Sequence, residues 1–210
     1  NYKYDLNNEG LGRVVDRSKV DEFINSLPFQ LTEDQKLAVD DIYNDLLEPK
    51  RMNRLVLGDV GSGKTCVAEI GMYINYLSGY QSSMMAPTEI LARQHYEGMT
   101  KMFSNTNVRV GLLVGSMKKS EKNKVCKELI NGEIDILVGT HALISENVEF
   151  KNLGLVITDE QHRFGVNQRN TFKNKGISPD VLSMSATPIP RTYALTVYGD
   201  MEISSIKTKP

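Results

Sequence analysis

Apolar residues along the chain gather into six short runs, and stretches with helical spacing separate most of these runs. The runs cover residues 54–57, 83–86, 108–114, 135–140, 154–159 and 181–186. Most of them are continuously apolar rather than alternating, which is typical of strands buried on both faces of a parallel sheet. The pattern therefore predicts six buried, mainly parallel strands.

Helical spacing marks residues 64–79, 88–103 and 119–132, and the first and last of these segments end at Gly79 and Gly132. Strands that alternate with helices need right-handed crossovers, which produce a doubly wound α/β sheet with helices on both faces. The ligands of such a sheet bind beyond the carboxyl ends of its strands.

Residues 1–30 have a different pattern, in which "DRSKVDEFINSL" predicts a short capped helix before "PF". We expect residues 1–30 to be a linker or helical appendage and residues 31–210 to form the main domain. The chain opens on Asn1 and stops at "IKTKP" without a plausible terminus, so we expect it to be part of a longer protein.

Composition changes this picture little. A chain of 210 residues that is 40% hydrophobic and 24% charged is typical of a soluble globular domain. The net charge of −1 neither demands nor excludes nucleic acid. No run approaches the roughly 18 apolar residues of a membrane span. Cys66 and Cys126 lack metal spacing, and we expect reduced thiols in a cytosolic protein.

The stretch "GDVGSGKT", residues 58–65, follows the first apolar run and matches the pattern G-x-x-x-x-G-K-[ST]. Its glycines let several backbone N–H groups converge on a phosphate at a helix N-terminus. Lys64 would neutralise the β- and γ-phosphates, and the Thr65 hydroxyl would bind Mg²⁺. Gly61 and Gly63 lack the third glycine of the pattern G-x-G-x-x-G, which disfavours a dinucleotide-binding fold. The predicted ATP-binding residues here are Gly58, Gly61, Ser62, Gly63, Lys64 and Thr65.

A second motif, "LVITDEQH" at residues 155–162, is an apolar strand that ends in two adjacent carboxylates. Burying an unpaired carboxylate is costly unless it meets a cation or water. Asp159 can hold Mg²⁺ while Glu160 orients and polarises the attacking water. Taken alone, a solvated strand end is the alternative. With the glycine-rich loop, the motif makes Lys64, Asp159 and Glu160 the expected catalytic residues.

A third motif, "SATPIPRT" at residues 185–192, also follows an apolar run. Its hydroxyls at Ser185 and Thr187 can hydrogen-bond carboxylates or His162 and sense whether the γ-phosphate is present. By itself this segment is better explained as an ordinary turn with two prolines.

Together these motifs resemble the first motor domain of superfamily 2 helicases and translocases, and most of all the RecG family of bacterial DNA helicases. The likeness covers about residues 27–210, and is most specific in "MNRLVLGDVGSGKT", "APTEILARQH", "TDEQHRFGV" and "SATPIPRTYALTVYGDMEIS". Transcription–repair coupling translocases are the alternative, but their acidic motif is usually D-E-E-H. Gln161 and Ser62 favour the RecG family.

The resemblance implies a RecA-like P-loop NTPase fold and a bacterial cytoplasmic enzyme. Such an enzyme uses ATP and Mg²⁺ to remodel branched DNA in repair and recombination. It also implies that Gln161, His162, Ser185 and Thr187 couple the ATP site to the DNA site. In "LPFQLTEDQ", Gln35 would read adenine and Phe29 would lie near the base. The alternative for Gln35 is a polar residue in the first turn of a helix capped by Thr32.

DNA contacts follow from the same resemblance. Backbone N–H groups, hydroxyls and one arginine suit a strand that is tracked without sequence readout. The residues implied are Thr88, Arg93, Gly115, Ser116, Thr140 and His141. Nearby, Lys118, Lys119, Lys122 and Lys124 form either a solvated helix face or an auxiliary DNA patch. His95 and His141 lack metal spacing, and for each we expect a hydrogen-bonding role.

The family also has a second motor domain, whose arginine reaches the γ-phosphate, and an N-terminal wedge domain. We expect both to be partners from the same protein, and little ATP hydrolysis by these 210 residues alone. We expect no membrane partner. Two classes of function stay open: the motor half of an ATP-hydrolysing helicase, and a nucleotide-regulated binding module without motor activity.

Overall fold

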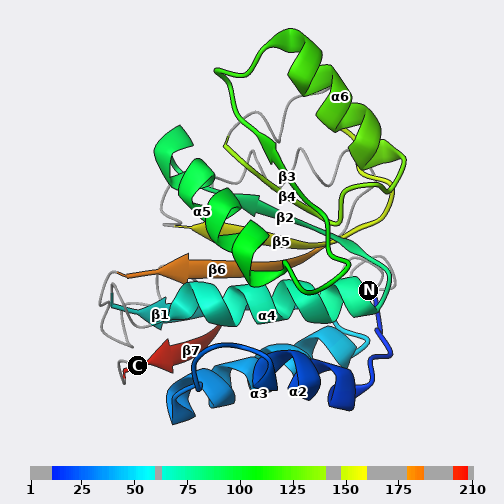
Figure 1. Cartoon of the computed structure of the whole chain (residues 1–210). Coiled ribbons are helices and arrows are strands. Elements are labelled where there is room, and N and C mark those ends of the chain that lie inside the picture. Colours follow the sequence, from blue (N-terminus) through cyan, green and yellow to red (C-terminus); the bar gives the residue numbers. More distant parts are fainter. Residues whose placement is uncertain (1–10, 60–62, 141–147, 160–178, 187–200, 208–210) are drawn as a thin grey trace, which may run out of the picture.

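The computed structural model describes residues 11–59, 63–140, 148–159, 179–186 and 201–207. In these residues, seven parallel strands form one sheet in the order β3-β4-β2-β5-β6-β1-β7 (Figure 1). The strands are β1 (Asn53–Gly58), β2 (Gln81–Met85), β3 (Val110–Leu113), β4 (Ile136–Gly139), β5 (Leu153–Asp159), β6 (Asp180–Ser185) and β7 (Glu202–Ile206). The six predicted strands are confirmed as β1 to β6.

Strand β7 was not predicted. It pairs with β1 along its length, from Arg54 opposite Glu202 to Gly58 opposite Ile206. In "EISSI" only Ser204 and Ile206 are buried, so the segment lacks the continuous apolar run that marked the other strands. Glu202 and Ser205 are exposed, and a strand that is not buried on both faces does not need a continuous apolar run.

The described helices are α2 (Arg17–Asn25), α3 (Glu33–Leu47), α4 (Lys64–Leu77), α5 (Glu89–Met102) and α6 (Lys119–Ile130). Those predicted at 64–79, 88–103 and 119–132 are confirmed as α4, α5 and α6. Gly79 (φ 90°) and Gly132 (φ 78°) follow α4 and α6 in the left-handed conformation that ends helices. The short helix after residue 15 is confirmed as α2, capped by Asp16.

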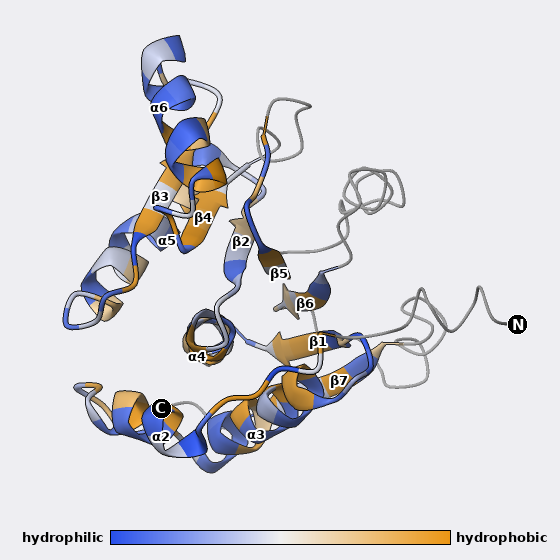
Figure 2. Cartoon of the chain, turned by 90° about the vertical axis from the view of Figure 1, so that its right-hand side faces the viewer, coloured by the Kyte–Doolittle hydropathy of each residue, from blue (hydrophilic) through white to orange (hydrophobic). Residues whose placement is uncertain are grey.

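Helices cover both faces of the sheet, which confirms the doubly wound α/β fold. Neighbouring strand residues point to opposite faces, and Met84 and Met85 of β2 indeed belong to two different hydrophobic clusters. The cluster of Met84 includes Ile70 of α4 and Met99 of α5, whereas that of Met85 includes Leu129 of α6. Figure 2 looks along α4, which lies beside the sheet between α5 and the α2–α3 pair.

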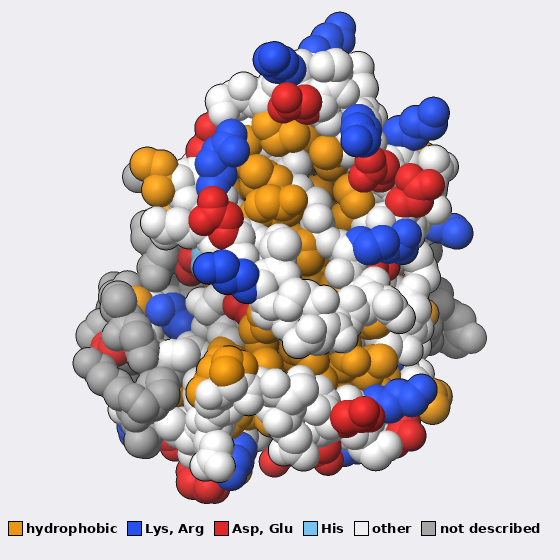
Figure 3. All heavy atoms as spheres, in the orientation of Figure 1, with side chains coloured by type: hydrophobic (Ala, Val, Ile, Leu, Met, Phe, Trp, Pro, Cys, Tyr) orange, Lys and Arg blue, Asp and Glu red, His pale blue; other side chains and the backbone are white. Residues whose placement is uncertain are grey.

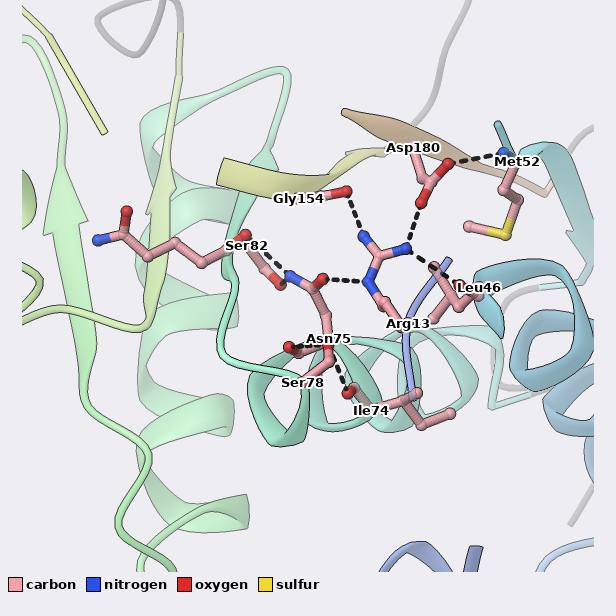
Figure 4. Close-up of polar contacts among 10 residues, drawn as sticks. Arg13, Leu46, Met52, Ile74, Asn75, Ser78, Ser82, Gly154 and Asp180 are labelled. Carbon is pink, nitrogen blue, oxygen red and sulfur yellow. Dashed lines mark hydrogen bonds and ion pairs between the residues drawn. The ribbon is translucent and has the colours of Figure 1, made fainter. Parts of the chain in front are cut away.

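Arg13 joins the N-terminal segment to the amino ends of the strands (Figure 4). Its guanidinium donates to the Asp180 carboxylate at the start of β6, to the carbonyl of Gly154 in β5 (2.6 Å), and to Asn75 Oδ1 of α4 (2.9 Å). A weaker bond reaches the Leu46 carbonyl at 3.3 Å. One buried side chain therefore links two strands to the ends of α3 and α4.

The segment before residue 30 also adds Val15, Val20 and Phe23 to the larger hydrophobic cluster. The predicted boundary between residues 30 and 31 stays a prediction. What the structure adds is that residues 13–23 pack against the sheet-bearing part of the chain.

The Arg13–Asp180 pair gives a testable stability difference. Both side chains are at most 2% exposed, and loss of one partner from a buried pair leaves an uncompensated group. Burial already raises the pKa of Asp180, and Arg13 offsets part of that rise. We expect Arg13→Met to lower the free energy of unfolding of the 210-residue chain by about 3 kcal/mol or more in urea denaturation.

Arg17→Met is the matched control. Arg17 pairs with Asp21 and Asp40, but its side chain is 35% exposed. A solvent-exposed ion pair contributes about 1 kcal/mol or less. Equal losses of stability in the two variants would contradict the structural role of Arg13.

Candidate nucleotide and DNA sites

The ends of β1, β6 and β5 lie side by side at one edge of the sheet. In the parallel register, Leu57 of β1 is opposite Ser185 of β6, and Met184 of β6 is opposite Asp159 of β5. Neighbouring strands are about 4.8 Å apart, so the ends of β1 and β5 are about 10 Å apart. The three predicted nucleotide motifs, each of which follows one of these strands, therefore begin at the same edge.

The start of α4 is suited to bind a phosphate. Gly63, which precedes Lys64, has φ 84°, a conformation that glycine adopts without strain. Within the described residues, no side chain at the N-cap accepts a hydrogen bond from the first turn of α4. The N–H groups of that turn and the positive end of the helix dipole are therefore available to an anion. Lys64 and Thr65 are half-buried beside them.

Gln35 lies against this loop. Gln35 Oε1 accepts from the Thr32 N–H (2.8 Å), and Thr32 Oγ1 accepts from the Gln35 N–H. Gln35 Nε2 donates to the Gly63 carbonyl at 3.3 Å. The helix-capping alternative is thus confirmed, and the same amide also contacts the residue before Lys64. Gln35 is only 1% exposed, so adenine reading stays a prediction.

Phe29 is 45% exposed and lines a hollow between α2, α4 and α5, together with Cys66 and Glu69. Burial raises the pKa of Glu69 to about 7 and that of the Cys66 thiol to about 12. Cys66 and Cys126 are free cysteines. The contact of Phe29 with a base stays a prediction.

Asp159 is the last residue of β5, and its carboxylate is close to a histidine. His95 Nε2 of α5 lies 2.9 Å from Asp159 Oδ2, and the two side chains are 14% and 11% exposed. Because a carboxylate can only accept, Nε2 carries the proton of this bond. Within the described residues, His95 is the one hydrogen-bond partner of the Asp159 carboxylate. A cation could therefore approach the other oxygen, Oδ1.

Sequence reasoning predicted a hydrogen-bonding role for His95, which is confirmed, but missed its partner. Ala92, His95 and Met99 are spaced by three and four residues, so they share one stripe of α5. Ala92 and Met99 are fully buried. That spacing could have indicated that His95 points toward the sheet. No group of three or more His, Cys, Asp or Glu that could hold a metal by itself occurs within the described ranges.

Four of the predicted DNA-contacting residues gather near the start of α5. Thr88 caps the helix by accepting from the Leu91 N–H at 3.2 Å. Arg93 Nη2 donates to Ser116 Oγ at 3.4 Å, and Ser116 also donates twice to Glu89, through its N–H (2.9 Å) and its hydroxyl (2.7 Å). Thr88, Arg93, Gly115 and Ser116 are all exposed.

Glu89 is an acidic residue that the sequence analysis did not single out. Its hydrogen bonds from Ser116 lower the pKa of Glu89, so the carboxylate is charged at neutral pH. It fixes the loop after β3 to the start of α5. Any phosphate bound here would have to sit beside this negative charge.

These residues follow β2 and β3, and Thr140 follows β4 and is 9% exposed. The edge of the sheet is thus divided in two. The predicted DNA motifs follow β3, β4 and β2, and the predicted nucleotide motifs follow β5, β6 and β1, the next three strands in the sheet order. Asp159 lies at the boundary.

The basic cluster lies on α6 and its N-cap. Lys122 donates to the Gly115 carbonyl (2.8 Å), Lys124 lies 3.9 Å from Glu128, and Lys118 and Lys119 are exposed. Lys118 and Lys124 line a hollow with Arg93 and Ser116. Figure 3 shows apolar side chains on the face of the molecule near this hollow, flanked by lysine, arginine and acidic residues. Both alternatives for this cluster stay open.

Several predicted residues cannot be located. Gly61, Ser62, His141, Glu160, Gln161, His162 and Thr187 lie outside the described residues. Ser185 is described, and is 4% exposed at the end of β6. None of the helices in the described part of the chain is long and apolar enough to span a membrane.

Comparison with known proteins agrees with this geometry. Proteins named ATP-dependent DNA helicase RecG are 56% identical in Staphylococcus epidermidis and 53% identical in Bacillus subtilis, over 93% and 96% of this chain. The chain spans only 28% and 30% of the length of those relatives.

Among solved structures, RecG bound to a three-way DNA junction is 50% identical, with a TM-score of 0.85, over 96% of this chain and 27% of that one. The DNA-bound helicase MrfA has a TM-score of 0.70 at 15% identity, a likeness of fold alone. A family model described as DEAD/DEAH box helicase matches residues 32–196. These residues include the loop before α4, Asp159 and both halves of the sheet edge, and the chain belongs to the DEAD/DEAH box helicase family.

Proposed function

We propose that this chain is the first motor domain of a RecG-type DNA helicase, which couples ATP hydrolysis to the remodelling of branched DNA in repair and recombination. The division of one sheet edge into a nucleotide half and a DNA half is the observation that carries the proposal. The 53–56% identity to proteins named RecG supports it, as does the likeness to a RecG structure bound to a three-way DNA junction.

In the nucleotide half, the N–H groups at the start of α4 and the Lys64 ammonium bind the phosphates of ATP. The Thr65 hydroxyl and the Asp159 carboxylate hold Mg²⁺, which withdraws charge from the phosphates when bound. Glu160, the residue after Asp159, orients the attacking water. Phe29 and Gln35 hold the adenine, and Gln161, His162, Ser185 and Thr187 couple the ATP site to the DNA site.

In the DNA half, one strand lies across the ends of β2, β3 and β4. The Thr88 hydroxyl, the Arg93 guanidinium and the N–H group of Gly115 contact its phosphates, and the Ser116 hydroxyl joins them once it releases Glu89. Thr140 and His141 extend this row. Such contacts carry no sequence information, which suits an enzyme that moves along any DNA.

The remainder of the machine lies in other parts of a longer protein. A second motor domain supplies an arginine to the γ-phosphate, and a wedge domain separates the DNA arms. The 28–30% of the relatives' length that this chain spans leaves room for both. We place the protein in the bacterial cytoplasm, where its DNA substrates lie.

ATP turnover by the full-length protein tests this function. We expect turnover to be low without DNA and strongly stimulated by forked or three-way DNA. Nucleotide-dependent DNA binding without turnover would instead indicate a binding module. Equal stimulation by linear duplex and by forks would favour a translocase of the transcription–repair type.

Lys64→Ala tests the phosphate assignment. The variant loses a charge and a hydrogen-bond donor at the phosphates, and we expect ATP turnover of the full-length protein to fall by about 10² to 10³-fold. Lys36→Ala is the control, because Lys36 is exposed on α3 and pairs with Glu33 at 3.4 Å. Turnover at the wild-type rate in Lys64→Ala would rule out this role.

Glu160→Gln separates binding from hydrolysis. The amide keeps the size of the side chain but cannot accept a proton, so hydrolysis should fall by about 10²-fold or more. Binding of a fluorescent ATP analogue should persist. Glu97→Gln on the exposed face of α5 is the matched control. If ATP binding is lost while hydrolysis per bound ATP is unchanged, Glu160 does not activate water.

A further inference from the structure

The bond between His95 and Asp159 crosses the boundary between the two halves of the sheet edge. His95 belongs to α5, which starts among the predicted DNA-contacting residues, whereas Asp159 ends the first strand of the nucleotide half. The bond is 2.9 Å long, and it is formed by side chains rather than by the β2–β5 backbone ladder. The contact therefore depends on how α5 packs on the sheet.

Helix α5 is a stiff connection between Thr88 and His95. Thr88 is the N-cap and His95 lies seven residues later, which is about 10 Å along a helix. Arg93, between them, contacts Ser116 in the loop after β3. Ala92 and Met99, on the same stripe as His95, are fully buried and hold this part of the helix against the core. A phosphate bound at Thr88 or Arg93 therefore acts on the helix that carries His95.

At the other end, His95 restricts the Asp159 carboxylate. The Nε2–H group of His95 donates to Asp159 Oδ2, and the carboxylate has no second partner among the described residues. A carboxylate fixed in this way presents its Oδ1 lone pairs in one direction. Groups that hydrogen-bond to a metal-binding side chain set its orientation, and their loss typically costs about 10 to 100-fold in metal affinity or activity.

If the bond had a purely structural role, the two polar side chains would need each other because both were shielded from water. The two side chains keep 14% and 11% of their surface exposed, so each can reach water if the other is removed. The Arg13–Asp180 pair, by comparison, is at most 2% exposed. The position of the His95–Asp159 bond, between two functional segments, is thus better explained by positioning than by stability.

We propose that His95 is a positioning residue that orients Asp159 for Mg²⁺ and links the DNA contacts at the start of α5 to the nucleotide site. The proposal rests on the function proposed above and goes beyond it in assigning the link to one side chain. In this role His95 acts through Asp159 rather than on the nucleotide itself.

The test uses the full-length protein and two equilibrium measurements. The first is the Mg²⁺ concentration that half-saturates binding of a fluorescent, non-hydrolysable ATP analogue. The second is the factor by which forked DNA tightens that binding at saturating Mg²⁺. The variants are His95→Ala, which removes the donor, and His95→Gln, whose Nε2 can donate from a similar position. Glu97→Ala, exposed on the same helix, is the control.

We expect His95→Ala to raise the half-saturating Mg²⁺ concentration about 10-fold or more and to reduce the DNA-dependent tightening. His95→Gln should recover most of both, and Glu97→Ala should match wild type. Metal-free analogue binding and the thermal unfolding midpoint should change little. A wild-type Mg²⁺ requirement in His95→Ala overturns the inference, as does equal loss in the Ala and Gln variants.

The two proposals can fail separately. If the wild-type protein shows no Mg²⁺-dependent binding of the analogue, the proposed function fails and this inference falls with it. If wild type binds the analogue normally and all His95 variants behave alike, the inference alone is overturned. If His95→Ala does not fold, the comparison of His95→Gln with Glu97→Ala still tests the inference. The inference requires His95→Gln to give near-wild-type values in both measurements.

Discussion

The parallel direction of every described strand is the constraint on which the candidate sites depend. Parallel pairing brings the carboxyl ends of all strands to one edge, where a chain can collect side chains from segments far apart in sequence. The strand order then decides which segments become neighbours. Here β3, β4 and β2 bring together the predicted DNA motifs, and β5, β6 and β1 bring together the nucleotide motifs. The two groups meet between β2 and β5, where His95 contacts Asp159.

At the opposite edge of the sheet, a buried arginine contacts the amino ends of two strands. Arg13 fixes the amino ends of β5 and β6, the two strands whose carboxyl ends carry Asp159 and Ser185. The fit is close, because a Cβ at Gly154 would lie 2.9 Å from Arg13 Nη2. A buried arginine from the N-terminal segment thus stabilises the strands that hold the nucleotide motifs.

The sequence predicted the fold better than the contacts within the site. Continuous apolar runs marked β1 to β6, because strands buried on both faces need them, whereas the half-exposed β7 lacks such a run and was missed. The phosphate loop and Asp159 follow local patterns that require particular residue types. The partners of Asp159 and Ser116, which are His95 and Glu89, depend on how α5 packs on the sheet, and no local spacing specifies that contact. Gln35 showed both a capping pattern and a family pattern, and its geometry confirmed the capping pattern.

We propose that this chain is one of two motor domains. ATP turnover by the 210 residues alone is the most direct test of that proposal. Phosphoryl transfer needs charge stabilisation from both sides of the γ-phosphate, and an arginine supplied across a cleft contributes about 10³ to 10⁵ in rate. In the proposed site, Lys64 stabilises charge on one side of the γ-phosphate only. We therefore expect negligible ATP turnover by the folded 210-residue chain, with or without forked DNA, under conditions in which the full-length protein hydrolyses ATP. Robust, DNA-stimulated turnover by these 210 residues would contradict it.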